Sequence, residues 1–174
     1  VLRAPCDDAP DYAALVPDLQ AVLSESVRQR VQKTRHARIG LLFSGGLDCT
    51  VLAALTAQHH AGPIDLINVS FENPRAIAAA WAVAEAPVKH DAFPADPYAV
   101  PDRVTARESY AQLAQLYPTH TFRLVQVNVP YAVYVSCLDT VQMLMSPQAS
   151  VMDLSIAAAL FFASRGEGSG DGGP

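Results

Sequence analysis

The pattern of apolar and polar residues divides the chain into segments with two different periods. Apolar residues recur every three or four positions from about Leu15 to Arg35, which predicts an amphipathic helix. The run Ile39–Phe43 is apolar throughout, as in a strand buried on both faces. Residues Ile64–Phe71 predict a second strand after the break at Gly62-Pro63, and the alternating segment Phe122–Val129 predicts a third.

Helical periodicity fills the segments between and after these strands. Ser150 and Asp153 have the spacing of a capping box, which predicts that the last helix begins there, and Gly166 is placed to cap its C-terminal end. Four prolines between residues 86 and 104 predict a surface loop. The helices expected after the first strand cover residues 47–55, 77–84, 110–117, 133–145 and 150–165.

The order of these elements predicts the fold class. Strand, turn, helix and strand between residues 39 and 71 have the length of one βαβ unit of about 30 residues, whose strands are parallel. We therefore expect a three-layer α/β fold, with a parallel sheet and helices on both faces. The expected division is a helical lead-in at 1–36, the α/β domain at 37–165 and a glycine-rich flexible tail at 166–174.

Composition and charge exclude several classes of protein. Hydrophobic residues make up 51% of the 174 positions, which argues against disorder, and the net charge of −5 argues against nucleic-acid binding. No apolar run approaches the roughly 20 residues of a membrane span. Cys6, Cys49 and Cys137 are widely separated, which excludes a disulfide scaffold or a zinc ribbon and suits a reducing compartment. We expect a cytoplasmic protein.

The candidate chemistry lies in the turn Ser44–Thr50, between the first strand and its helix. Two glycines allow the backbone to approach an anion, and the helix N-terminus favours negative charge. Asp48 suits such a site only if a divalent cation bridges it to phosphates. The turn is neither a Walker loop nor a GxGxxG turn. A plain strand-to-helix turn with Asp48 as the helix cap explains the residues equally well, so they leave the two interpretations open.

A resemblance to a known family adds to this pattern. The segment FSGGLDCT, residues 43–50, resembles the SGGxDS loop of the N-type ATP pyrophosphatases, or PP-loop ATPases. Residues 64–73, 102–113 and 150–166 are similar to the asparagine synthetase domain of that superfamily, and closest to a divergent branch, the asparagine synthetase domain-containing proteins. The resemblance covers the chain from about residue 19 to 166. It implies an adenine nucleotide alpha-hydrolase-like fold.

The resemblance also implies a reaction. Such domains bind ATP and Mg²⁺, and an aspartate carboxylate attacks the α-phosphorus to form aspartyl-AMP and pyrophosphate. Ammonia, supplied by glutamine in the glutamine-hydrolysing enzymes, then converts the adenylate to asparagine. The implied partners are these small molecules, with no nucleic acid and no membrane. Carried onto this chain, the resemblance assigns pyrophosphate contacts to Ser44, Gly45, Gly46, Asp48, Cys49 and Thr50, magnesium to Asp48, and the adenosine flanks to Leu42, Val69 and Phe71.

Three departures from the family pattern bear on catalysis. Cys49 replaces the usual loop serine, the glutaminase half with its N-terminal cysteine is missing, and no Gly-x-Gly-x-Asp-Glu loop follows a strand. Residues 166–171 resemble that second loop only in composition. Arg107 is the remaining candidate for a catalytic or phosphate contact. We therefore expect ATP–magnesium binding at most, in a domain incomplete at its C-terminal end, with a non-catalytic nucleotide-binding or interaction module as the alternative.

Overall fold

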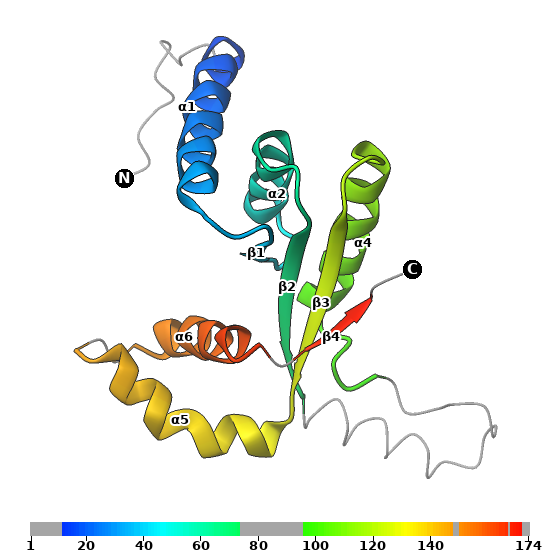
Figure 1. The fold of residues 1–174 in the computed structure, drawn as a ribbon. Helices are drawn as coiled ribbons and strands as arrows, with labels where there is room; N and C mark the ends of the chain where they lie inside the picture. The colour runs from blue at the N-terminus through cyan, green and yellow to red at the C-terminus, as the bar shows by residue number, and fades with distance from the viewer. Residues whose placement is uncertain (1–11, 74–95, 148–149, 167, 172–174) are drawn as a thin grey trace, which may run out of the picture.

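A four-stranded sheet runs through the computed structural model, which describes residues 12–73, 96–147, 150–166 and 168–171. Strands β1 (Ile39–Leu42), β2 (Ile64–Phe71) and β3 (Phe122–Val129) are parallel, and β4 (Ser169–Asp171) runs antiparallel to β3. Their order in the sheet is β1-β2-β3-β4 (Figure 1). This arrangement confirms the α/β class and the three predicted strands.

Helices cover both faces of the sheet (Figure 1). Helices α2 and α4 pack on one face, α1 packs against α2 beside β1, and α6 covers the other face with α5 behind it. None of the helices in these described ranges is long and apolar enough to cross a membrane. The helix bounds are Tyr12–Lys33 for α1, Leu47–His59 for α2, Pro101–Leu116 for α4, Tyr131–Met145 for α5 and Val151–Ser164 for α6.

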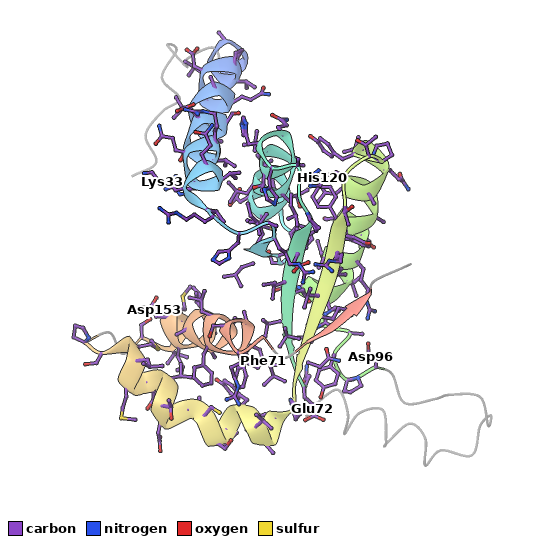
Figure 2. The ribbon with its side chains drawn as sticks, viewed as in Figure 1. Lys33, Phe71, Glu72, Asp96, His120 and Asp153 are labelled. Carbon is purple, nitrogen blue, oxygen red and sulfur yellow. The ribbon has the colours of Figure 1, made fainter. Side chains whose placement is uncertain are left out.

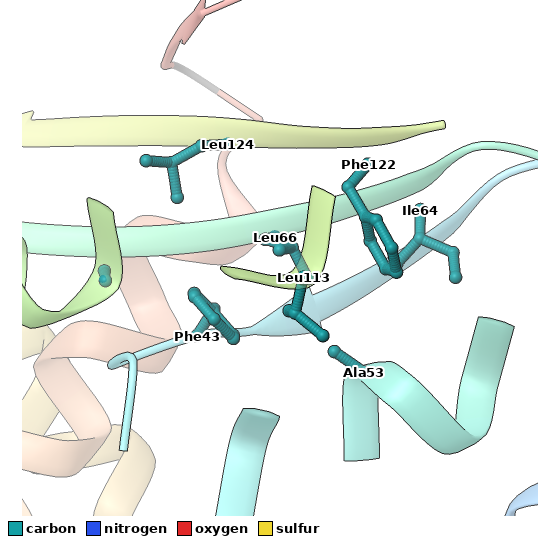
Figure 3. Packing of buried hydrophobic residues seen from close by; sticks show 8 residues of the cluster. Phe43, Ala53, Ile64, Leu66, Leu113, Phe122 and Leu124 are labelled. Atoms are coloured by element: carbon teal, nitrogen blue, oxygen red, sulfur yellow. The ribbon is translucent and has the colours of Figure 1, made fainter. Parts of the chain in front are cut away.

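Alternation along β2 and β3 produces two separate cores. Even-numbered side chains such as Ile64, Leu66 and Leu124 face α2 and α4, where they pack with Phe43 and Leu113 (Figure 3). The odd-numbered side chains face α6 and α5 and form the second core. Its buried residues are Val127, Val129 and Phe162, with Ile67, Val69, Phe71, Val125, Tyr134, Cys137 and Phe161 packed against them.

Strands β1 and β2 begin level but end at different heights. Ile39 pairs with Ile64, and Leu42, the last residue of β1, pairs with Ile67. Strand β2 continues for four more residues to Phe71, about 13 Å further along the sheet. The chain therefore leaves β1 halfway along β2, and the loop after β1 lies beside the middle of its neighbour.

Two of the predicted helix ends are confirmed. The Ser150 hydroxyl accepts a hydrogen bond from the Asp153 amide at 3.0 Å and donates to the Asp153 carboxylate at 2.7 Å. Gly166, directly after α6, has φ +70°, the left-handed conformation of a C-terminal glycine cap. Strand β4 begins three residues later, at Ser169.

The structure corrects the predictions at two places. The expected loop to residue 104 is wrong at its end, because α4 begins at Pro101, where a proline is favourable in the first helical turn. The expected flexible tail contains β4, which pairs with the Leu124–Gln126 segment. This pairing uses backbone hydrogen bonds, so the pattern of apolar side chains does not predict it. The helix predicted at 77–84 lies outside the described residues.

Candidate functional site

The loop between β1 and α2 touches α4 backbone to backbone. Gly45 is buried and has φ +82°, in the left-handed region that favours glycine. A Cβ atom at this position would lie 2.5 Å from the Cα of Ala106 and from the carbonyl carbon of Thr105. Both the conformation and the contact therefore require glycine at position 45.

Gly46 is not required by the fold in the same way. It is the N-cap of α2 with φ −66° and ψ 170°, and an added Cβ would meet only the Ser44 hydroxyl, at 3.4 Å. No side chain caps the helix at Gly46, and Asp48 lies exposed in the first turn, so the interpretation of Asp48 as the helix cap is wrong. Uncapped amides at a helix N-terminus favour an anion.

Three side chains with hydroxyl or thiol groups surround this loop. Thr50 Oγ1 and Cys49 Sγ donate to the Gly46 carbonyl at 2.8 and 3.2 Å. Ser44 Oγ lies 3.5 Å from Cys49 Sγ and 3.4 Å from the Gly46 amide nitrogen. The structure thus brings the predicted loop residues together around one short stretch of backbone.

A cleft of about 240 Å³ opens directly beside the loop, at the point where β1 ends and β2 continues. It has apolar walls from the sheet and α6 and a polar end at Ser44, Asn68 and Asp102. Its volume is below the roughly 300–1,000 Å³ of whole-ligand pockets, so it suits one part of a ligand that extends over the loop. The cleft is lined by Leu42, Phe43, Ser44, Ile67, Asn68, Val69, Asp102, Ile156, Ala159 and Leu160.

The cleft contains two of the three predicted adenosine flanks. Leu42 and Val69 line it, whereas Phe71 lies further along β2 and packs edge-to-face on Tyr134 and Phe162, with ring centroids 5.1 and 5.9 Å away (Figure 2). Phe71 is separated from the cleft because β2 is four residues longer.

Arg103, at the start of α4, is buried, although the charged group Asp102, Arg103, Arg107 and Glu108 is typical of a solvated helix start. Its guanidinium donates to Asn68 Oδ1 at 2.5 Å, to Gln126 Oε1 at 2.7 Å and to Asn128 Oδ1 at 2.9 Å. It also donates to the Val127 carbonyl at 3.1 Å. Only 1% of the Arg103 residue surface is exposed. These bonds tie the first turn of α4 to the middle of β2 and β3.

Arg107, the predicted catalytic candidate, does not line the cleft. Its guanidinium donates to Gln126 Oε1 at 2.7 Å and lies 3.8 Å from the Asp96 carboxylate. Tyr98 lies two residues after Asp96, in the segment that precedes α4. Burial raises the pKa of Tyr98, and the Glu72 and Asp96 carboxylates add to the shift. Among the charged residues Asp102, Arg103, Arg107 and Glu108, Asp102 lines the cleft.

Comparison with known proteins identifies the family. The sequence profile described as asparagine synthase matches residues 18–119, more than half of the chain. The chain is 42% identical over 164 residues to an asparagine synthetase domain-containing protein of Saccharomyces cerevisiae, covering 87% of this chain and 28% of that protein. The chain belongs to the asparagine synthase family. No solved structure matches it.

Further members of the asparagine synthase family show the same partial coverage. The chain is 34% identical over 166 residues to an asparagine synthetase domain-containing protein of Drosophila melanogaster, covering 84% of this chain and 27% of that protein. It is 32% identical over 164 residues to asparagine synthetase domain-containing protein 1 of Homo sapiens, covering 77% of this chain and 24% of that protein. The chain spans less than a third of the length of these relatives.

The glycine-rich segment after α6 contains β4, which lies at the opposite edge of the sheet from β1. Strand β4 lies three strand positions from β1, about 14 Å across the sheet. Gly168 packs against the side chains of Val125 and Val127, where an added Cβ would lie 3.0 to 3.1 Å from their methyl groups. The structure thus explains this glycine by its close approach to β3.

The described part of the chain holds no group of three or more His, Cys, Asp or Glu side chains that could bind a metal. Asp48 is the carboxylate nearest in sequence to the loop amides, and its side chain is exposed. One carboxylate, together with phosphate oxygens and waters, is a donor set that Mg²⁺ accepts, because this ion keeps several of its waters. The residues present therefore fit a metal that arrives with a nucleotide.

Proposed function

We propose that this chain is the ATP-binding part of an asparagine synthetase-like protein and binds ATP together with Mg²⁺. The observation that carries the proposal is the contact between the loop and the cleft. An uncapped helix N-terminus with a backbone exposed at Gly46 lies next to an apolar cleft lined by Leu42 and Val69. One site prefers anions and the other a flat apolar group, which together match a nucleotide.

Each part of the nucleotide would have its own contact. The adenine ring would lie between Leu42, Val69 and the α6 side chains, with the ribose toward the polar end of the cleft. The phosphates would lie over the loop, where the Gly45 and Gly46 amides and Ser44 can donate hydrogen bonds. The Thr50 hydroxyl would donate there after turning away from the Gly46 carbonyl. Bound Mg²⁺ would supply positive charge to the pyrophosphate, with Asp48 as its protein ligand.

The chemistry that this arrangement favours is displacement at the α-phosphorus. Such reactions depend on positioning and on neutralising charge rather than on covalent help from the protein. The loop amides would hold the leaving pyrophosphate while an aspartate carboxylate attacks, as in the family reaction. For the whole protein, conversion of the aspartyl-adenylate to asparagine with ammonia is part of the same proposal.

Calorimetric titration of the purified chain with ATP, with and without Mg²⁺, tests the binding step. We expect saturable binding that depends on Mg²⁺ and is lost in Asp48→Ala. The matched control is Asp139→Ala, an exposed aspartate on α5, which should bind like the unmodified chain. Failure to bind ATP at millimolar concentration would overturn the proposal.

A second measurement separates binding from catalysis. Exchange of labelled pyrophosphate into ATP that requires aspartate would identify the acceptor. We expect no asparagine from this chain with aspartate, ATP and ammonia, because the acidic second loop is not found in it. ATP binding without exchange would favour a nucleotide-binding module over an enzyme, and asparagine formation would show that the chain is catalytic.

A further inference from the structure

The carbonyl group of Gly45 is held by a side chain from α4. Ser109 Oγ donates a hydrogen bond to the Gly45 carbonyl oxygen at 2.7 Å, across 64 residues of sequence. One turn earlier in α4, the backbone of Ala106 lies against the Gly45 Cα. The loop therefore has a polar contact and a steric contact with the same helix.

The hydrogen bond from Ser109 fixes the direction of the Gly46 N–H as well as that of the Gly45 carbonyl. The Gly45–Gly46 peptide is planar and trans, so its C=O and N–H point in opposite directions. A carbonyl held toward α4 directs the Gly46 N–H away from α4. That N–H has only a long contact of 3.4 Å, with Ser44 Oγ, which a phosphate oxygen can replace.

Helix α4, which carries Ser109, is held in place by hydrogen bonds to the sheet. Arg103 donates to Asn68 Oδ1, and Asn68 Nδ2 donates to the Phe43 carbonyl at 2.8 Å. Phe43 is the residue directly before the loop. The carbonyl groups of Phe43 and Gly45 are thus both oriented by side chains that are connected to α4.

We propose that Ser109 is a positioning residue, which aims the Gly46 amide at a bound phosphate by holding the Gly45 carbonyl. The inference rests on the proposed ATP binding and adds to it a residue outside the loop motif. Ser109 touches no substrate in this arrangement. Its effect belongs to the phosphate end of the nucleotide, whereas the adenosine end depends on the cleft.

The test compares Ser109→Ala with Thr105→Ala. Thr105 is a matched control, because its hydroxyl donates to the Pro101 carbonyl within α4 and does not reach the loop. We expect Ser109→Ala to weaken ATP and pyrophosphate binding about three- to tenfold, the loss of one hydrogen bond. The inhibition constant of adenosine, measured in competition with ATP, should stay unchanged, and Ser109→Thr should restore ATP binding.

The outcomes separate this inference from the proposed function. If Ser109→Ala binds ATP as well as the unmodified chain does, or loses ATP and adenosine affinity to the same extent, Ser109 is not a positioning residue and the ATP site stands. If the unmodified chain binds no ATP, both proposals fail together. Thermal unfolding without ligand shows whether a loss arises from the fold rather than from the loop.

Discussion

The backbone of Ala106 occupies the space that a side chain at Gly45 would need. This contact joins a loop and a helix that are about 60 residues apart in the chain, without any side chain between them. The glycine at position 45 is therefore part of the packing between α4 and the sheet as well as part of the loop. The neighbouring glycine at position 46 has no such contact, and the two positions can be tested against each other.

Gly45→Ala should destabilise the fold, because alanine is strained at φ +82° and its Cβ would collide with α4. We expect the free energy of unfolding in urea to fall by at least about 2 kcal/mol. Gly46→Ala should change it by less than about 1 kcal/mol but reduce ATP affinity, since a methyl group would stand beside the loop amides. Equal destabilisation by the two substitutions would contradict the distinction.

Arg103→Met should cost about 3 kcal/mol of stability, because it leaves the buried oxygens of Asn68 and Gln126 without this donor. Arg107→Met is the control. The Arg107 side chain is 47% exposed, its ion pair with Asp96 is long, and the Gln126 oxygen that it contacts keeps Arg103 as a donor, so a loss below about 1 kcal/mol is expected. Urea unfolding of both variants measures the difference. A small loss in Arg103→Met would show that the network is not what fixes α4.

Asp48→Asn should leave stability unchanged, because the Asp48 side chain is exposed in the first turn of α2. If it holds Mg²⁺, the substitution should raise the dissociation constant of the Mg²⁺–ATP pair by about tenfold or more. Binding of ATP in the presence of a chelator should be the same in both proteins. An equal loss with and without Mg²⁺ would mean that Asp48 contacts something other than the metal.

His120 should make the fold sensitive to mild acid. Burial lowers the pKa of His120 below its usual 6.5, with the nearby His60 adding to the shift, and the ring packs 5.0 Å from that of Phe122 near the opposite end of the sheet from Phe71 (Figure 2). The folded protein binds this proton less tightly than the unfolded chain does. The neutral His120 ring therefore contributes fully to folding stability above pH 6.5, and this contribution is lost as the pH falls through the lowered pKa.

His120→Gln should therefore reduce the loss of stability between neutral and mildly acidic pH. The exposed His36 provides the control, because His36→Gln should keep the pH dependence of the unmodified protein. Urea midpoints at a series of pH values measure both. Identical slopes for His120→Gln and the unmodified chain would show that other groups cause the acid sensitivity.

Periodicity predicted the elements well but not their relative heights. The strands Ile64–Phe71 and Phe122–Val129 have the bounds that the sequence predicts. The Gly62-Pro63 break marks the start of the first strand, and Pro130 marks the end of the second. The four-residue difference between β1 and β2 follows from strand pairing, which no local pattern contains. Leu42 and Val69 therefore line one cleft, whereas Phe71, predicted to flank adenosine with them, lies further along β2.

The role of Arg103 was hidden for a similar reason. Beside Asp102, Arg107 and Glu108 it resembles part of a solvated charge cluster, yet it is buried. A signal was present in the strands, where Asn68 and Gln126 interrupt the apolar positions that face α4. Polar residues on a buried face need partners, and pairing this face with an arginine at the start of the next helix would have located the network.

The order of the strands in the sheet is also their order in the chain, so each strand pairs with one that is already synthesised. The loop after β1 is synthesised before the residues whose side chains restrain it. Asn68 follows Phe43 by 25 residues, and Ser109 follows Gly45 by 64. At roughly 5–20 residues per second, the loop waits about 3 to 13 seconds for Ser109. The loop that would hold the phosphates is thus made before the side chains that fix its conformation.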